Sequence, residues 1–278
     1  MLTRAWTWGM GELPGGHAPP KDASVWVILT LVCLGMGLGD LYGIGSSPIA
    51  KGAFRMAVHG GPCLAAVALV SAGPAALRAG AALLALTPAA WRFLDPDSLK
   101  AHPGVLIGVM VAAGVATRVS VGPVAWREAG LGLGDTRWWL PRAGLAIALV
   151  ILGVSAAVWL SPAMQAYYPS WKPARTDSVE LAKQLVGVSC DFIGWELMFR
   201  GVLLHLVARR GDPRLAIALQ TIPFFLLHAN KPGVEYWSSL PGGVIAGWFC
   251  LRAGTFVPLW GLHTVMYATA AITAFVLR

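Results

Sequence analysis

Long apolar runs separated by short polar breaks fill almost the whole chain. Most of them reach or approach the roughly 20 residues that an α-helix needs to cross a bilayer. The runs lie at 24–45, 62–91, 103–124, 142–161, 178–208, 213–230, 240–252 and 254–277. The run 240–252 is short, and it either continues back through Tyr236 and Trp237 or forms a re-entrant element. The pattern predicts an all-α fold, a polytopic transmembrane helical bundle with eight spans, or seven.

Composition supports a membrane protein. Of the 278 residues, 56% are hydrophobic and 12% are charged, whereas soluble proteins have roughly a quarter of their residues charged. The net charge of +8 comes from basic residues scattered over short loops. They form no basic stripe with interleaved aromatic residues of the kind that binds nucleic acid. We therefore expect membrane lipids as partners of these loops, and no nucleic acid.

The chain divides into three parts by sequence pattern. Residues 1–23 are rich in Gly, Pro and charge and are expected to be a loose N-terminal tail, while 24–124 hold N-terminal transmembrane helices. Residues 125–278 contain the chemistry-bearing segments discussed below. All four cysteines lie in or beside apolar runs and show no metal-ligand spacing, so we expect buried free thiols: Cys33, Cys63, Cys190 and Cys250.

Basic loops predict the orientation of the bundle. The segment RRGDPR (209–214) and the loop 118–142 are both basic, and two spans separate them, so they should share the cytoplasmic side. Lys51 and Arg55, assigned to a loop between the first two runs, should lie on the same side.

Four ionisable residues interrupt the apolar runs of the second half: Glu196, Arg200, His228 and His263. Such side chains cost about 2.5–3.5 kcal/mol at the centre of a bilayer, so they usually face a partner or a cavity. Glu196 and Arg200 are spaced i, i+4 and can pair. Counted from the basic boundaries, Glu196 and the two histidines lie at similar depths of roughly 16–21 Å.

This set of residues permits hydrolysis. Glu196 can act as a general base on water, and His228 and His263 can orient that water or stabilise an oxyanion. One Glu and two His can also bind zinc, although no HExxH-type pair is present. A purely structural ion pair between Glu196 and Arg200 is a further alternative. No GxSxG nucleophile motif occurs.

These residues stand in motifs that resemble those of the CPBP (Abi/CAAX-protease) family of intramembrane proteases. That family has Glu-Glu-x-x-x-Arg, then Phe-x-x-x-His, then His-x-x-x-Asn. The corresponding stretches here are WELMFRG with Glu196 and Arg200, FFLLH with Phe224 and His228, and HTVMY with His263.

The resemblance covers about residues 125–270, including the connectors GLGLGDTRWW, YYPSWKP and HANKPGVE, the last of which contains Asn230. Two positions depart from the family pattern. The first Glu, the water-activating base of the family, is Trp195, and the final Asn is Tyr267. Tyr267 can still donate a hydrogen bond to an oxyanion. The form WExxFRG is typical of a variant branch of the family.

The resemblance implies an intramembrane endopeptidase of the bacterial inner membrane that acts on peptides or lipidated proteins, prenylated ones included. The catalytic residues would be Glu196, His228 and His263. The supporting residues would be Arg200, Tyr267, Phe224, Trp195 and Asn230. A glutamate-type mechanism needs no cofactor, with Zn as the alternative. The competing hypothesis, based on Trp195, is an inactive scaffold or binding protein of the same fold.

Overall fold

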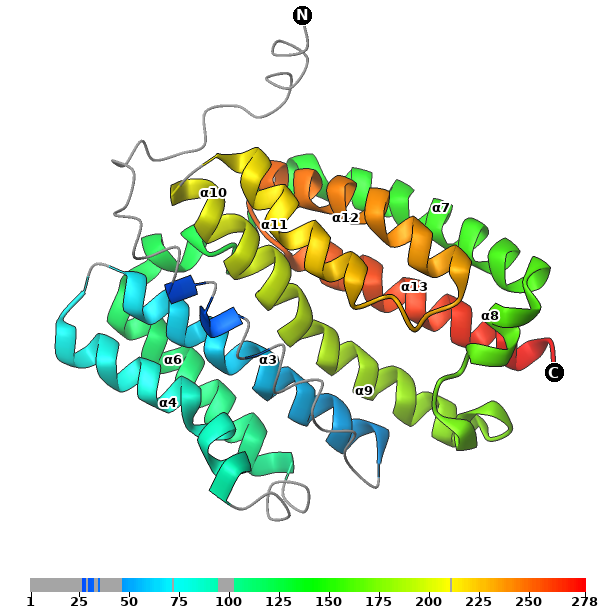
Figure 1. Ribbon diagram of the computed structural model, residues 1–278, viewed down its shortest axis with the longest axis horizontal. Helices are drawn as coiled ribbons and strands as arrows, with labels where there is room; N and C mark the ends of the chain where they lie inside the picture. Colours follow the sequence, from blue (N-terminus) through cyan, green and yellow to red (C-terminus); the bar gives the residue numbers. More distant parts are fainter. Residues whose placement is uncertain are drawn as a thin grey trace, which may run out of the picture.

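The computed structural model describes residues 47–71, 73–94, 103–210 and 212–278, together with a few positions between 27 and 35. The predicted tail, 1–23, lies outside these residues. The described part is helical and contains no strand, which confirms the all-α prediction (Figure 1). Its elements are α3 (Pro48–Val70), α4 (Ala75–Leu94), α6 (Pro103–Glu128), α7 (Thr136–Leu160), α8 (Pro162–Tyr167), η1 (Lys172–Arg175), α9 (Ser178–Glu196), η2 (Leu197–Leu206), α10 (Val207–Arg210), α11 (Pro213–Leu226), α12 (Gly233–Ala253) and α13 (Val257–Val276).

Short polar side chains fix where the helices begin. Asp135, Asp177 and Asp212 are the N-caps of α7, α9 and α11, and each accepts hydrogen bonds from backbone N–H groups of the first turn. Gly254 ends α12 with a φ of 71°, a left-handed conformation that glycine adopts without steric cost. These caps set the helix ends in the half of the chain that carries the candidate site.

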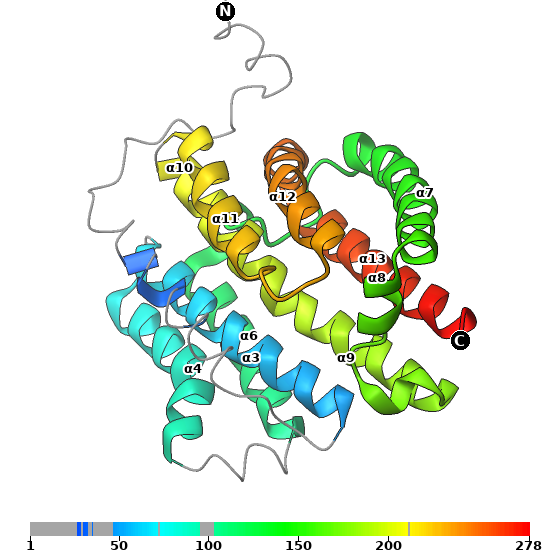
Figure 2. The ribbon, with the colours of Figure 1, turned by 45° about the vertical axis from the view of Figure 1, so that its right-hand side comes forward.

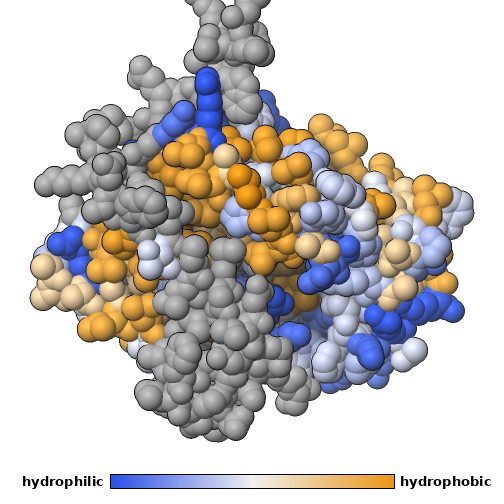
Figure 3. Space-filling model, viewed as in Figure 1, coloured by the Kyte–Doolittle hydropathy of each residue, from blue (hydrophilic) through white to orange (hydrophobic). Residues whose placement is uncertain are grey.

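The apolar surface of the bundle suits a lipid environment. By length and composition, three described helices, α3, α7 and α13, can cross a membrane. Along α7, Leu145, Leu149 and Leu152 are 61–70% exposed, a surface that lipid can cover. Figure 3 shows apolar residues over the upper part of one face, and hydrophilic residues toward the lower right, where α8 and the segment before α9 lie in Figure 1.

Helix α9 forms the centre of the fold. It lies between α3 on one side and α13 on the other (Figure 2). Glycines bring α3 and α9 into backbone contact, because a Cβ at Gly52 would clash with the carbonyl oxygen of Gly187. Gly194 faces Met56 further along, so the two helices run parallel. This glycine contact, Gly52 and Gly194 with their partners, attaches the N-terminal helices directly to α9.

The prediction for Lys51 and Arg55 was wrong. Both lie within α3, which begins at Pro48, where Ser47 caps the first turn. Gly52 meets Gly187 and Arg55 pairs with Asp191, so both residues lie beside the middle of the continuous helical stretch 178–210 and away from Arg209 at its end. The loop assignment failed because the apolar run 62–91 covers parts of two helices, which are separated by the turn around Ser71.

The structure decides the question left open for the short run, while the count of eight or seven spans stays a prediction. The short run 240–252 continues back through Tyr236 and Trp237 as α12. The two basic segments expected on one side do meet, since Arg209 donates to the carbonyl of Glu128.

Candidate functional site

Glu196 and its partners form a buried polar cluster between α9, η2 and α13. One carboxylate oxygen, Oε1, accepts from Arg200 Nη1 at 3.1 Å and contacts His263 Nδ1 at 2.8 Å. The side chains of Glu196 and Arg200 are 1% and 2% exposed, and that of His263 is 18% exposed. The structure thus brings together two helix segments that the sequence placed at similar depth.

Contacts between α9 and α13 hold His263 against Glu196. The indole of Trp260 donates to the carbonyl of Ser189 at 2.9 Å, which fixes the two helices relative to each other. The ring of Phe192 stacks on the His263 imidazole with centroids 3.8 Å apart and planes 14° apart. His263 therefore has a defined ring orientation as well as a defined partner.

The backbone changes its helix type at Glu196. Residues Leu197–Leu206 form a π-helix that directly continues α9. Long π-helical stretches are rare, and π-type irregularities concentrate at functional sites. Arg200 lies in this stretch, which makes the helix around the buried ion pair structurally distinct from the rest of the bundle.

Phe224 connects the Glu196 pair to His228. The Arg200 guanidinium lies 4.1 Å from the centroid of the Phe224 ring, a cation–π contact. The same ring lies 4.5 Å from the His228 ring and 6.2 Å from the His263 ring, centroid to centroid. His228 Nδ1 donates to the carbonyl oxygen of Phe224 at 2.7 Å. Below, these five residues, Glu196, Arg200, Phe224, His228 and His263, are called the Glu196 cluster.

Trp195 points away from Glu196, as adjacent helix positions do. Its ring packs edge-on against His59 of α3 at 5.6 Å and lies 4.9 Å from the ring of Phe199. Trp195 is therefore a packing residue at the border between α3 and the Glu196 cluster.

Two other supporting residues lie outside the cluster. The Tyr267 hydroxyl bonds to Ser170 Oγ at 2.7 Å, and its ring contacts Phe192, which stacks on His263. Asn230 is exposed in the turn after α11. The structure thus connects Tyr267 to the cluster through Phe192, whereas Asn230 lies at the surface.

A second polar cluster, on α3 and α9, was missed from the sequence. Asp191 Oδ2 pairs with Arg55 Nη1 at 3.2 Å, and Asp191 Oδ1 lies 3.6 Å from His59 Nδ1. The signal was present, since Lys51, Arg55 and His59 are spaced i, i+4, i+8 and therefore share one face of a helix. Assigning them to a loop concealed it.

The two carboxylate oxygens of Glu196 determine the chemistry of the Glu196 cluster. Oε1 is held by Arg200 and His263, whereas Oε2 is buried and receives no hydrogen bond from any described residue. A carboxylate with one fixed and one unbonded oxygen can accept a proton from a water molecule or another donor.

A metal site would need a different arrangement. Structural and catalytic zinc sites use at least three protein ligands at about 2 Å. Within the described ranges, no three His, Cys, Asp or Glu side chains are grouped in this way. Glu196 and His263 are in direct contact, whereas the Phe224 ring contacts His228 and lies next to the other two residues' side of the cluster.

The region that contains the Glu196 cluster matches a known protein family. Residues 179–269 match the family model described as "Type II CAAX prenyl endopeptidase Rce1-like". The match includes every member of the Glu196 cluster, whereas α3 lies outside it. No curated protein and no solved structure matches the chain.

Proposed function

Because residues 179–269 are a segment of the Rce1-like family of type II CAAX prenyl endopeptidases, we propose that this integral membrane protein is an intramembrane endopeptidase. It hydrolyses peptide bonds in membrane-associated peptides or proteins, prenylated ones included. The observation that carries the proposal is the buried Glu196 carboxylate, with Oε1 fixed and Oε2 unbonded within the described part of the chain.

In this mechanism Glu196 activates water. Oε2 takes a proton as the water oxygen attacks the scissile carbonyl carbon. His228 positions the water, because Nδ1 donates to the Phe224 carbonyl and so leaves Nε2 as an acceptor in the neutral ring. The proton taken by Glu196 then passes to the leaving amide nitrogen when the tetrahedral intermediate collapses.

Three neighbouring residues support these steps. His263, held by Glu196 through Nδ1, presents an Nε2–H to the oxyanion when its ring is doubly protonated. The Arg200 guanidinium compensates the charge of the buried carboxylate. Tyr267 acts as a positioning residue for His263 through Phe192.

The remaining parts of the proposal concern cofactor and location. We assign no resident metal, since the ligand pattern in the described residues favours a glutamate-type mechanism. The bacterial inner membrane is the proposed location, and the partners are membrane lipids and a peptide or lipidated-protein substrate. A non-catalytic scaffold of the same fold is the second candidate, because Trp195 has a packing role where the resembling family has its base.

Replacing Glu196 tests the enzyme against the scaffold. Glu196→Gln keeps the shape of the side chain and removes the base, so turnover in proteoliposomes should fall by about 10²–10⁴-fold. His228→Ala should lose a similar factor, and the double variant little more, because residues of one catalytic unit are not additive. Glu180→Gln on the same helix, whose partner Lys183 is exposed, is the control. Cleavage by Glu196→Gln at the wild-type rate would favour the scaffold.

A further inference from the structure

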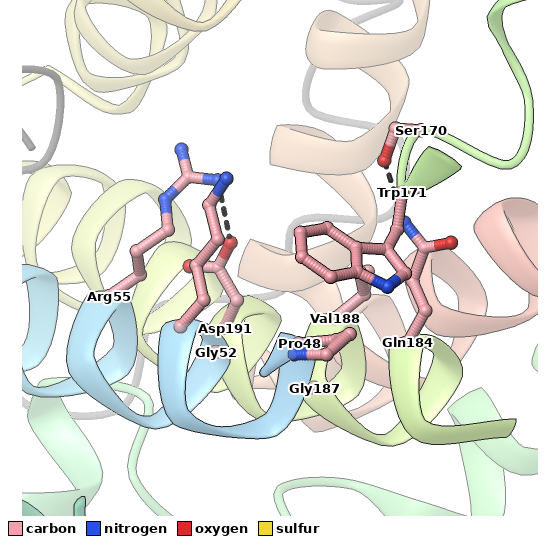
Figure 4. Close-up of a pocket in the computed structure, with 10 residues that line it drawn as sticks. Pro48, Gly52, Arg55, Ser170, Trp171, Gln184, Gly187, Val188 and Asp191 are labelled. Atoms are coloured by element: carbon pink, nitrogen blue, oxygen red, sulfur yellow. Dashed lines mark hydrogen bonds and ion pairs between the residues drawn. The ribbon is translucent and has the colours of Figure 1, made fainter. Parts of the chain in front are cut away.

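A hollow lies between α3, α9 and the segment that precedes α9. It has a volume of about 90 Å³. Figure 4 shows Arg55 and Asp191 paired at one end, with the indole of Trp171 between them and Gln184. Lys51 and Ser170 also line it. Below, this hollow is called the Lys51 pocket.

Cations exceed anions in the Lys51 pocket. Arg55 is paired with Asp191 through one guanidinium nitrogen at 3.2 Å, and a guanidinium has further N–H donors to offer. Among the described residues, no carboxylate lies within ion-pair distance of Lys51. Two cations and one carboxylate therefore line a partly enclosed space, which is a setting for a second anion.

The Lys51 pocket is linked to the Glu196 cluster through two helices. On α9, Asp191 precedes Glu196 by five residues, or roughly 7.5 Å along the axis. On α13, Tyr267 bonds to the pocket residue Ser170 and follows His263 by one turn, roughly 6 Å. The near edge of the pocket is thus about 6–8 Å from the Glu196 cluster along the bundle, and Lys51, at the level of Gly187, is about 14 Å from it.

We infer that the Lys51 pocket binds the C-terminal carboxylate of the substrate, two to four residues beyond the scissile bond. An extended peptide spans about 3.3–3.6 Å per residue, so this number of residues covers the separation. Lys51 and Arg55 would contact the carboxylate, and the Trp171 indole would contact the last side chain. The inference rests on the proposed function. It adds the residues that recognise the C-terminal end of the substrate.

The size of the pocket favours a carboxylate over a lipid phosphate. A hollow of about 90 Å³ holds only a few water molecules. It admits a planar carboxylate, but it is small for a phosphodiester that carries glycerol and two acyl chains. The pocket residues on α3 also lie outside the family match, so this contact would be contributed by the N-terminal helices of this chain.

The test compares two forms of one peptide. A farnesylated decapeptide that ends in a CaaX box is supplied as the free acid and as the C-terminal amide to the full chain in phosphatidylcholine nanodiscs. The wild type should prefer the acid by about tenfold to a hundredfold in kcat/KM, the range expected for a hydrogen bond to a charged group. The preference should appear mainly in KM, and Lys51→Met should lower it, with Arg55 keeping the remainder.

Lys183→Met is the matched control, because Lys183 is an exposed lysine of α9 outside the pocket. It should keep the wild-type preference. Equal cleavage of acid and amide by the wild type, or an unchanged preference in Lys51→Met, would overturn the inference and leave the proposed protease standing.

Binding of both peptides separates the two proposals. Acid-selective binding that depends on Lys51, without any cleavage, would support the pocket and contradict the protease. Absence of both cleavage and acid-selective binding would contradict both. Nanodiscs that contain phosphatidylglycerol test the lipid source: Lys51-dependent binding of that lipid, with no discrimination between the peptides, would overturn the carboxylate assignment.

Discussion

The buried pair of Glu196 and Arg200 makes a quantitative prediction about stability. Both side chains are almost fully buried, and their atoms lie 3.1 Å apart. Removing one partner of such a pair typically costs about 3–5 kcal/mol, because the other charge is left without compensation. Arg200→Met should therefore lower the free energy of unfolding by about this amount, a large part of the roughly 5–15 kcal/mol of a typical protein.

A double-mutant cycle isolates the pair. Glu196→Gln alone leaves the guanidinium uncompensated, whereas Glu196→Gln/Arg200→Met removes both charges and so avoids that penalty. The coupling energy should be at least about 2 kcal/mol. The pair of Lys183 and Glu180, 2.6 Å apart with side chains 45% and 25% exposed, is the reference, and its coupling should stay below about 1 kcal/mol.

Reversible unfolding in mixed micelles gives these free energies, with the 13 tryptophans of the chain as the fluorescent reporters. If Arg200→Met does not fold, Arg200→Lys keeps the charge and should lose only part of the coupling. A coupling within about 0.5 kcal/mol of zero would refute the reasoning, since it would mean that the two charges do not compensate each other.

Three further predictions concern packing and metal. Trp195→Phe should change turnover by less than about tenfold in the cleavage assay, because the ring packs against His59 and takes no part in proton transfer; a loss as large as the roughly 10²-fold expected for removing a general base would contradict this. Gly52→Ala should destabilise the fold by about 1–3 kcal/mol, since its Cβ would meet the backbone of Gly187. Gly80→Ala, with no atom near the added Cβ, should stabilise slightly, and thermal unfolding separates the two. Chelators should leave turnover unchanged, whereas stoichiometric zinc in the purified protein, lost together with activity, would favour a metalloprotease.

Much of the architecture could be predicted from the sequence, because apolar runs of sufficient length are a direct signal for membrane helices. The signal failed where a run covered two helices. The break around Ser71 within 62–91 is short and only partly polar, so the run was read as one helix that begins at 62. The true first helix, α3, begins at Pro48. Lys51 and Arg55 are charged residues near the beginning of α3. Their charge alone led to the assignment of this segment to a loop.

The Glu196 cluster was easier to predict than the Lys51 pocket. The i, i+4 spacing of Glu196 and Arg200 and the matching depth of His263 are properties of a regular helix, and the structure brings these three side chains together. The π-helix at 197–206 could not be predicted, because its hydrogen-bond shift depends on tertiary packing. The Lys51 pocket depends on contact between helices more than 120 positions apart in the chain, which no local pattern reveals.

The glycine contact between α3 and α9 has a practical consequence for protein engineering. An expression fragment cut to the family-matched residues 179–269 would expose the glycine face of α9 where α3 normally lies. Such a fragment would offer an unmatched, backbone-rich surface to detergent or to another copy of itself. Shortened versions for crystallisation or screening should therefore begin before Ser47, which caps α3. The same contact allows the two parts to be supplied as separate chains, with a break placed in the loop that joins α6 to α7.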